Sequence, residues 1–185
     1  MRFCIGLTLL AACGFAIAAD PTPEDAFKML DKMKARYRKD KKGDGVASID
    51  LGRKRITDND LKTIAALKNV RELNLGGPIK STDGAKIVYE PRQITDAGLK
   101  NIAGMTSLTK LSLDGTNITD AGLKHLADMQ KLQVLVLSDT KVTDEGMKEL
   151  TKLKSLQQVN VINTKVTSDG ETILKRWKLE LKVAR

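Results

Sequence analysis

Residues 117–150 read NITDAGLKHLADMQKLQVLVLSDTKVTDEGMKEL, and this stretch contains one pattern twice. The triplet ITD at 118–120 returns as VTD at 142–144, a spacing of 24 residues, with Leu132, Leu135 and Leu137 in between. A pattern that recurs at a fixed period is typical of repeat architectures. Four apolar residues at this spacing each open an (I/V)-T-(D/S) triplet: Ile94, Ile118, Val142 and Val166.

Each repeat predicts one short strand and one helix. The L-x-L pair Leu111 and Leu113 has the two-residue period of a strand with one buried face. Leu99, Ile102 and Met105 follow the three-residue spacing of one helical face. An earlier unit fits the same frame at 56–75, and 46–51 supplies another strand. The step from Ile56 to Ile94 is 38 residues, 14 more than one repeat, so we expect an insertion within 77–92.

These motifs resemble the leucine-rich repeat family over residues 46–185, in the 24-residue form (I/V)TDxGLxxLxxLxxLxxLxLxxT of many exported bacterial proteins and of F-box-type substrate receptors. The resemblance implies an α/β solenoid, a short arc with a parallel inner sheet and helices outside. Some six strands at about 4.8 Å each would span roughly 25 Å. It also implies non-catalytic binding of another protein. Thr116, Thr140 and Thr164 stand where the family often has Asn or Cys, and we expect their hydroxyls to bond nearby backbone.

Composition and the first residues predict an exported protein. The 185-residue chain is 41% apolar, has 3% aromatic residues and carries a formal net charge of +9. Residues 1–18 have a positive residue, a short apolar run and an Ala-x-Ala site, as in a secretory signal peptide. We therefore expect a periplasmic or extracellular chain that starts at Ala19 without a transmembrane segment. The alternative is a lipoprotein anchored through Cys13. Both cysteines lie in this segment, so disulfides and cysteine nucleophiles are excluded from the mature chain.

The two ends of a solenoid need covers. Residues 19–45 predict an N-terminal cap, with a helix over 22–38 followed by a turn. At the other end, Trp177 falls in the column of Leu67, Met105, Met129 and Leu153. This position predicts that Trp177 closes the last repeat. A binding anchor is the other interpretation.

No residue set predicts a catalytic centre, a metal site or a cofactor, so we expect a protein that is not an enzyme. His125 is the only histidine, and its column is otherwise polar. Residues 40–45 resemble the start of an EF-hand loop, but Lys42 and Leu51 stand where ligands are needed. A carboxylate column could in principle hold calcium, but helix capping explains each member. This column consists of Asp58, Asp96, Asp120 and Asp144.

The predicted partner-binding surface is the concave strand face. The alternating strand positions that point away from the core are Ser48, Asp50, Glu72, Asn74, Lys110, Ser112, Val134, Val136, Gln158 and Asn160. Val134 and Val136 are apolar where water is expected, so they are either the centre of a contact patch or residues that simply suit a strand. The insertion carries Ile87, Val88 and Tyr89 and is either part of the binding face or a plain loop.

A basic patch predicts a second kind of partner. The excess positive charge gathers on the cap in Lys34, Arg36, Arg38, Lys39, Lys41 and Lys42. This patch is either a solvated face or a dock for an anionic envelope polysaccharide or membrane surface. Nucleic acid is disfavoured by the predicted export and by the scarcity of interleaved aromatic residues.

Overall fold

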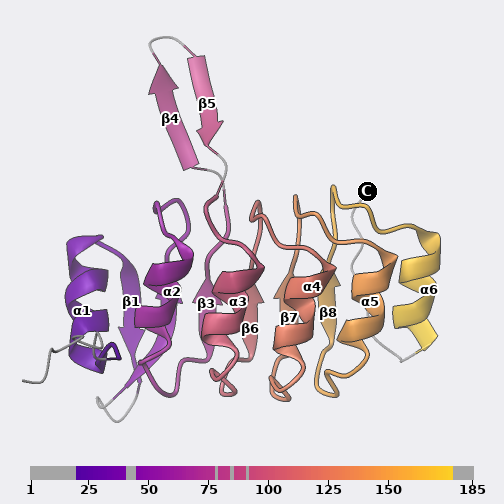
Figure 1. Ribbon diagram of the computed structural model, residues 1–185, viewed down its shortest axis with the longest axis horizontal. Coiled ribbons are helices and arrows are strands. Elements are labelled where there is room, and N and C mark those ends of the chain that lie inside the picture. Colours follow the sequence, from indigo (N-terminus) through magenta and orange to yellow (C-terminus); the bar gives the residue numbers. More distant parts are fainter. Residues whose placement is uncertain (1–19, 41–44, 78, 84–85, 91, 177–185) are drawn as a thin grey trace, which may run out of the picture.

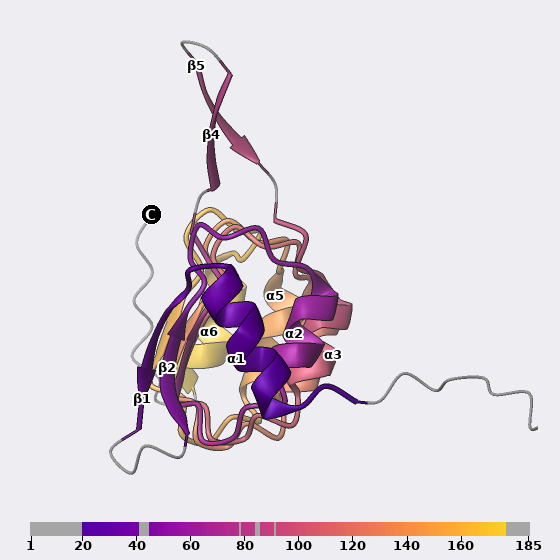
Figure 2. The same ribbon diagram turned by 90° about the vertical axis from the view of Figure 1, so that its left-hand side faces the viewer.

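The computed structural model describes residues 20–40, 45–77, 79–83, 86–90 and 92–176. The predicted signal peptide and Trp177 lie outside these residues. Two layers stack along the chain, with a sheet on one side and the helices on the other (Figures 1 and 2). The helical elements are α1 Pro23–Lys32, α2 Asp58–Ile64, α3 Asp96–Ile102, α4 Asp120–Leu123, the 3₁₀ helix η1 Lys124–Leu126, α5 Asp144–Leu150 and α6 Ser168–Arg176.

The main sheet has six strands in the order β1-β2-β3-β6-β7-β8, and a hairpin, β4-β5, stands apart from it. The strands are β1 Arg36–Lys39, β2 Val46–Asp50, β3 Glu72–Asn74, β4 Ile79–Asp83, β5 Lys86–Glu90, β6 Lys110–Ser112, β7 Val134–Val136 and β8 Gln158–Asn160. Strands β2 to β8 of the main sheet pair in parallel, in register with the repeat. The predicted α/β solenoid is thereby confirmed.

The core lies between the two layers and is aliphatic. The central strand residues Ile49, Leu73, Leu111, Leu135 and Val159 are at most 2% exposed and point toward the helices. The helices contribute the repeated apolar columns, including the fully buried Leu99, Leu126 and Leu150. Every second side chain of each strand points to the opposite face of the sheet, and none of the described helices lies over that face (Figure 2).

The N-terminal cap differs from its prediction. The expected helix over 22–38 is wrong in its second half, since α1 ends at Lys32 and β1 pairs antiparallel with β2. The sequence at 36–38 has a strand period, with Tyr37 inside and an arginine on each side. Tyr37 packs on Phe27 of α1 with ring centroids 5.9 Å apart, and its hydroxyl donates to Asp31 at 2.9 Å. Asp31 raises the pKa of the Tyr37 hydroxyl above its ordinary value. The cap is therefore one helix and one edge strand.

Adjacent repeats are joined by a carboxylate clasp. Each threonine of the triplets at 95, 119 and 143 caps its own helix, because its hydroxyl accepts a backbone N–H of the first turn. The aspartate that follows does not, and the prediction that it caps the helix is wrong. Asp96, for example, accepts hydrogen bonds from the backbone nitrogen and hydroxyl of Thr119 at 2.8 and 2.6 Å. Both oxygens of this aspartate are therefore engaged by the next repeat.

The same clasp recurs at Asp58, Asp120 and Asp144, each bonded to the next repeat's threonine. Hydrogen bonds from Thr167 lower the pKa of Asp144, the effect of the hydroxyl being the largest. Among the described residues, no group of three metal-ligating side chains is present. The carboxylate column is a structural joint between repeats.

Candidate functional site

The uncovered face of the sheet carries two straight rows of side chains, which we call the open face. The first row joins Ser48, Glu72, Lys110, Val134 and Gln158, and the second joins Asp50, Asn74, Ser112, Val136 and Asn160. Members of a row are direct register partners on neighbouring strands, so they lie about 4.8 Å apart. The structure thus brings together every strand residue predicted for the binding face.

Val134 and Val136 are the only apolar members of these two rows. Both are half-buried, although none of the described helices covers them. A shallow pocket of about 300 Å³ reaches Val136 and is lined by residues of four strands, from Ser48 to Val136. Its polar lining includes the exposed Glu72 and Lys110. This arrangement is an apolar pair with a polar rim, which is the composition of a small contact surface.

The basic patch lies on the strand side of the cap and not on its helix. Arg36 and Arg38 extend the two rows, because β1 places them opposite Asp50 and Ser48. Lys34 and Lys39 are exposed at the two ends of β1, and Lys39 lies 6.0 Å from the Phe27 ring. Lys41 and Lys42 lie outside the described residues. Arg36 and Arg38 are therefore continuous with the predicted strand face, whereas Lys39 Nζ lies over the Phe27 ring on the helix side.

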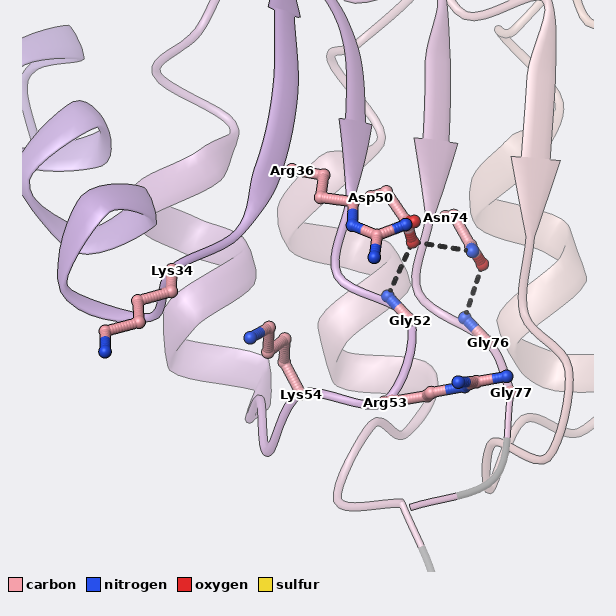
Figure 3. A pocket seen from close by; sticks show the side chains of 9 residues that line it. All are labelled: Lys34, Arg36, Asp50, Gly52, Arg53, Lys54, Asn74, Gly76 and Gly77. Carbon is pink, nitrogen blue, oxygen red and sulfur yellow. Dashed lines mark hydrogen bonds between the residues drawn. The ribbon is translucent and has the colours of Figure 1, made fainter. Parts of the chain in front are cut away.

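A pocket of larger volume opens where β2 and β3 end, and we call it the basic pocket. Its volume is about 480 Å³, and it is lined by Lys34, Arg36, Asp50, Gly52, Arg53, Lys54, Asn74, Gly76 and Gly77 (Figure 3). Four of these side chains are cations and one is a carboxylate. Arg36 lies beside Asp50, and Arg53 extends toward Gly77 (Figure 3). Arg53 and Lys54 were not predicted as site residues.

The floor of the basic pocket is fixed by hydrogen bonds. Asp50 Oδ1 accepts from the backbone nitrogen of Gly52 at 2.9 Å and from Asn74 Nδ2 at 2.8 Å. Asn74 Oδ1 in turn accepts from the backbone nitrogen of Gly76 at 3.0 Å. A Cβ atom on Gly52 would lie 2.8 Å from Asn74 Nδ2, so this approach requires glycine. The polar groups of the floor are held in one arrangement without blocking the opening.

Arg92 supports the basic pocket from behind. Its side chain is 3% exposed and donates to Lys54 O at 3.0 Å, to Gly76 O at 3.0 Å and, through Nε, to Gly77 O at 3.0 Å. A further contact joins Nη2 to Gly77 O. Burial lowers the pKa of Arg92, and Asp114 opposes this. The guanidinium remains charged and ties together the two turns that line the pocket.

The special position of Arg92 can be recognised in the sequence only when the repeats are aligned with one another. Arg92 occupies the column of Thr116, Thr140 and Thr164, each two residues before the apolar residue that opens its triplet. Those threonines donate to the carbonyl three residues earlier, at 2.6 to 2.7 Å, which confirms their predicted role. The insertion separates this column from β3. A side chain at position 92 must therefore be longer than threonine and carry several N–H donors to reach the carbonyls of Lys54, Gly76 and Gly77.

The insertion forms the hairpin β4-β5 and projects beyond both layers at the strand ends (Figures 1 and 2). Gly77, at its base, lines the basic pocket. Ile87, Val88 and Tyr89 lie on β5 and pair with Thr82, Ser81 and Lys80. The hairpin therefore begins beside the pocket, and a binding role for its three apolar residues stays a prediction.

The remaining candidate motifs are parts of the framework. His125 lies in η1 and is half-buried on the helix side. Asp40, at the start of the EF-hand-like segment, donates its backbone N–H to Gly45 O at 2.9 Å, and residues 41–44 lie outside the described part. This contact joins the two ends of the connection between β1 and β2.

Comparison with known proteins finds a family model that matches two of the repeats. The family model described as Leucine Rich repeat matches residues 104–127 and 128–150. A solved structure of an internalin from Listeria monocytogenes strain 4b F2365 is similar, with 17% identity, 71% of this chain covered and a TM-score of 0.36. The match covers 52% of that internalin, so the chain spans about half of its length. No curated protein matches. Within the described ranges, no helix combines the length and apolar character needed to cross a bilayer.

Proposed function

We propose that the chain binds another protein on its open face, because two adjacent repeats match the family model described as Leucine Rich repeat and stacked repeats of this kind form extended binding surfaces. The observation that carries this proposal is the pair Val134 and Val136, which are apolar on a face that none of the described helices covers. Neighbouring strands surround the pair with polar side chains. A partner that places an apolar group there gains hydrophobic contact at the centre and polar contacts around it.

We place this scaffold in the bacterial envelope or outside the cell. The support is the signal-peptide pattern of residues 1–18, including its Ala16-Ile17-Ala18 site. Lipid attachment at Cys13 is the alternative route to the envelope. In both cases the repeats act outside the cytoplasm.

A second candidate function is adhesion to an anionic polysaccharide or membrane surface. It is favoured by Arg36 and Arg38, whose side chains continue the rows of the open face. The two candidates differ in their response to salt. Attraction to a polyanion weakens steeply as ions screen the charges, whereas a contact centred on apolar side chains is less sensitive.

The test compares capture of partners by the protein from Ala19 onward and by Val134→Ser with Val136→Ser. The immobilised proteins are exposed to envelope extract at about 50 and 500 mM salt, and the affinity of the purified captured partner is then measured. Burial of each valine contributes on the order of 1–2 kcal/mol at about 25 cal/mol per Å². The double variant should therefore bind about ten- to a hundredfold more weakly.

A matched control places serine on the helix side, as Ala97→Ser with Ala121→Ser, where both alanines are exposed. This control should bind like the unaltered protein, and both variants should unfold at nearly the same temperature. The proposal would be rejected if the valine substitutions left the affinity unchanged while neutralising the cap cations abolished binding. That result would favour binding to an anionic surface. The cations are Lys34, Arg36, Arg38 and Lys39.

A further inference from the structure

The basic pocket has a charge that the described residues do not balance. Lys34, Arg36, Arg53 and Lys54 line it, and none of the four forms an ion pair with another described residue. The residues that line the basic pocket therefore carry four positive charges and one negative charge, the carboxylate of Asp50. Like charges gathered around one concave space repel each other, so an anion that enters relieves this repulsion.

The chemistry of the pocket fits a carboxylate attached to a peptide. Guanidinium groups such as those of Arg36 and Arg53 bind carboxylates through paired N–H donors. Asp50 Oδ1 is occupied by Gly52 and Asn74, while Oδ2 has no described partner. A peptide offers both an anionic side chain for the arginines and a backbone N–H for Asp50 Oδ2. A polyanion without N–H or O–H donors would leave that acceptor facing a like charge.

The basic pocket also joins the apolar pair through the open face. It shares Asp50 and Asn74 with the shallow pocket that reaches Val136. From β2 to β7 the sheet order gives three steps, β2-β3-β6-β7. At about 4.8 Å per step, this distance is roughly 14 Å. An extended peptide covers it with about four residues at roughly 3.3 Å each.

We propose that the basic pocket binds the carboxylate of an acidic peptide segment whose apolar residue, about four positions away, contacts Val134 and Val136. The binding of a carboxylate rests on the basic pocket alone. The contact with Val134 and Val136 rests on the proposed protein-binding function. Arg92 is a positioning residue in it, because it holds the turns that carry Lys54 and Gly77.

The first experiment uses a fluorescently labelled hexaglutamate peptide and measures its affinity by anisotropy at about 50 and 300 mM salt. The pocket variant is Arg53→Asn with Lys54→Gln. Asparagine suits position 53 because Arg53 has a φ of 67°, in the left-handed region. The control is Lys100→Gln with Lys124→Gln, which removes two charges from the helix side, where both lysines are exposed.

The pocket variant should lose at least tenfold in hexaglutamate affinity, and the control should lose less than threefold. Equal losses in the two variants, or no binding to the unaltered protein, would overturn the acidic-peptide pocket. Dextran sulfate serves as the competing polyanion. Tighter binding of dextran sulfate than of hexaglutamate at matched charge would also overturn the assignment to a peptide.

The second experiment separates the pocket from the proposed function. It uses two peptides with a Glu-Glu pair and one leucine, separated by three or by eight Gly/Ser residues. The shorter peptide should bind about tenfold more tightly than the longer one, and Val134→Ser with Val136→Ser should remove this advantage. If the two peptides bind with equal affinity while the affinity for hexaglutamate still depends on Arg53 and Lys54, the result supports the carboxylate-binding pocket and rejects the contact with the valines.

Discussion

The clasp between repeats can be tested at Gly122 of α4. Gly122 follows the T-D-x-G pattern, and a Cβ atom there would overlap Asp96 Oδ1 and lie 2.9 Å from Asp96 Cγ. Its contact with Ile118 Cγ2, at 3.1 Å, is the mildest of the three. Gly122→Ala should therefore displace the Asp96 carboxylate from Thr119. The two hydrogen bonds that it accepts, at 2.8 and 2.6 Å, would be lost or lengthened.

The expected magnitude is the difference between two effects. A hydrogen bond to a charged group contributes about 1.5–3 kcal/mol, and the lower end applies because Asp96 is only half-buried. Losing both therefore costs about 3 kcal/mol. Alanine in place of glycine in a helix returns up to about 1 kcal/mol. We expect the free energy of unfolding to fall by about 2 kcal/mol, measured by urea unfolding monitored by circular dichroism.

Two variants make this test specific. Gly104→Ala is the matched control, because no atom lies within 4 Å of its added Cβ, and its free energy of unfolding should stay equal or rise slightly. In an Asp96→Ala background the carboxylate is absent, so Gly122→Ala should cost less than about 1 kcal/mol. Equal effects of the two glycine substitutions, or full additivity with Asp96→Ala, would refute the clasp as the reason for this glycine.

Three further outcomes follow from the same structure. Arg92→Met should lower the free energy of unfolding by about 2–4 kcal/mol in urea, because buried carbonyls lose their donors, and an unchanged midpoint would contradict this. The pKa of Asp144 is below its ordinary value of 3.8 in the folded state, so its stabilisation is present above that value and is lost as the pH falls through the folded pKa. The difference in unfolding free energy between the protein and Asp144→Asn should therefore shrink below about pH 4. The intact mass of the exported protein should correspond to a chain starting at Ala19, and a diacylglycerol adduct on Cys13 would instead identify a lipoprotein.

Most of the fold could be predicted because the same sequence pattern recurs in every repeat. One L-x-x-L-x-L motif is weak, but its recurrence every 24 residues fixes strand, helix and insertion in the same frame. The edge strand β1 could not be found in this way, since it occurs once. Its four residues carry three positive charges, and only pairing with β2 and the contact of Tyr37 with Phe27 select a strand there.

The candidate site was predictable where it follows the repeat and was missed where it depends on turns. The two rows of the open face follow directly from the alternation of side chains in each strand. The basic pocket combines Lys34, Arg53 and Lys54, which belong to two different turns, with β1, whose position was not predicted. The aspartate clasp was also missed, because its partner threonine lies 23 residues later for Asp96 and 37 residues later for Asp58.

The positions that differ between repeats carry the argument for function. Where the repeats agree, as in the leucine columns and the clasps, the side chains are already engaged by neighbouring repeats and have no capacity left for a ligand. Several positions at which the repeats differ lie on the open face or beside the basic pocket: Val134 and Val136 in the rows, Arg92 in the threonine column, and the hairpin that begins at Gly77. A stacked repeat is stabilised by its uniform positions, so its non-uniform positions can vary without loss of the fold. The apolar pair and the unbalanced cations among them make the open face and the basic pocket the places to test for binding.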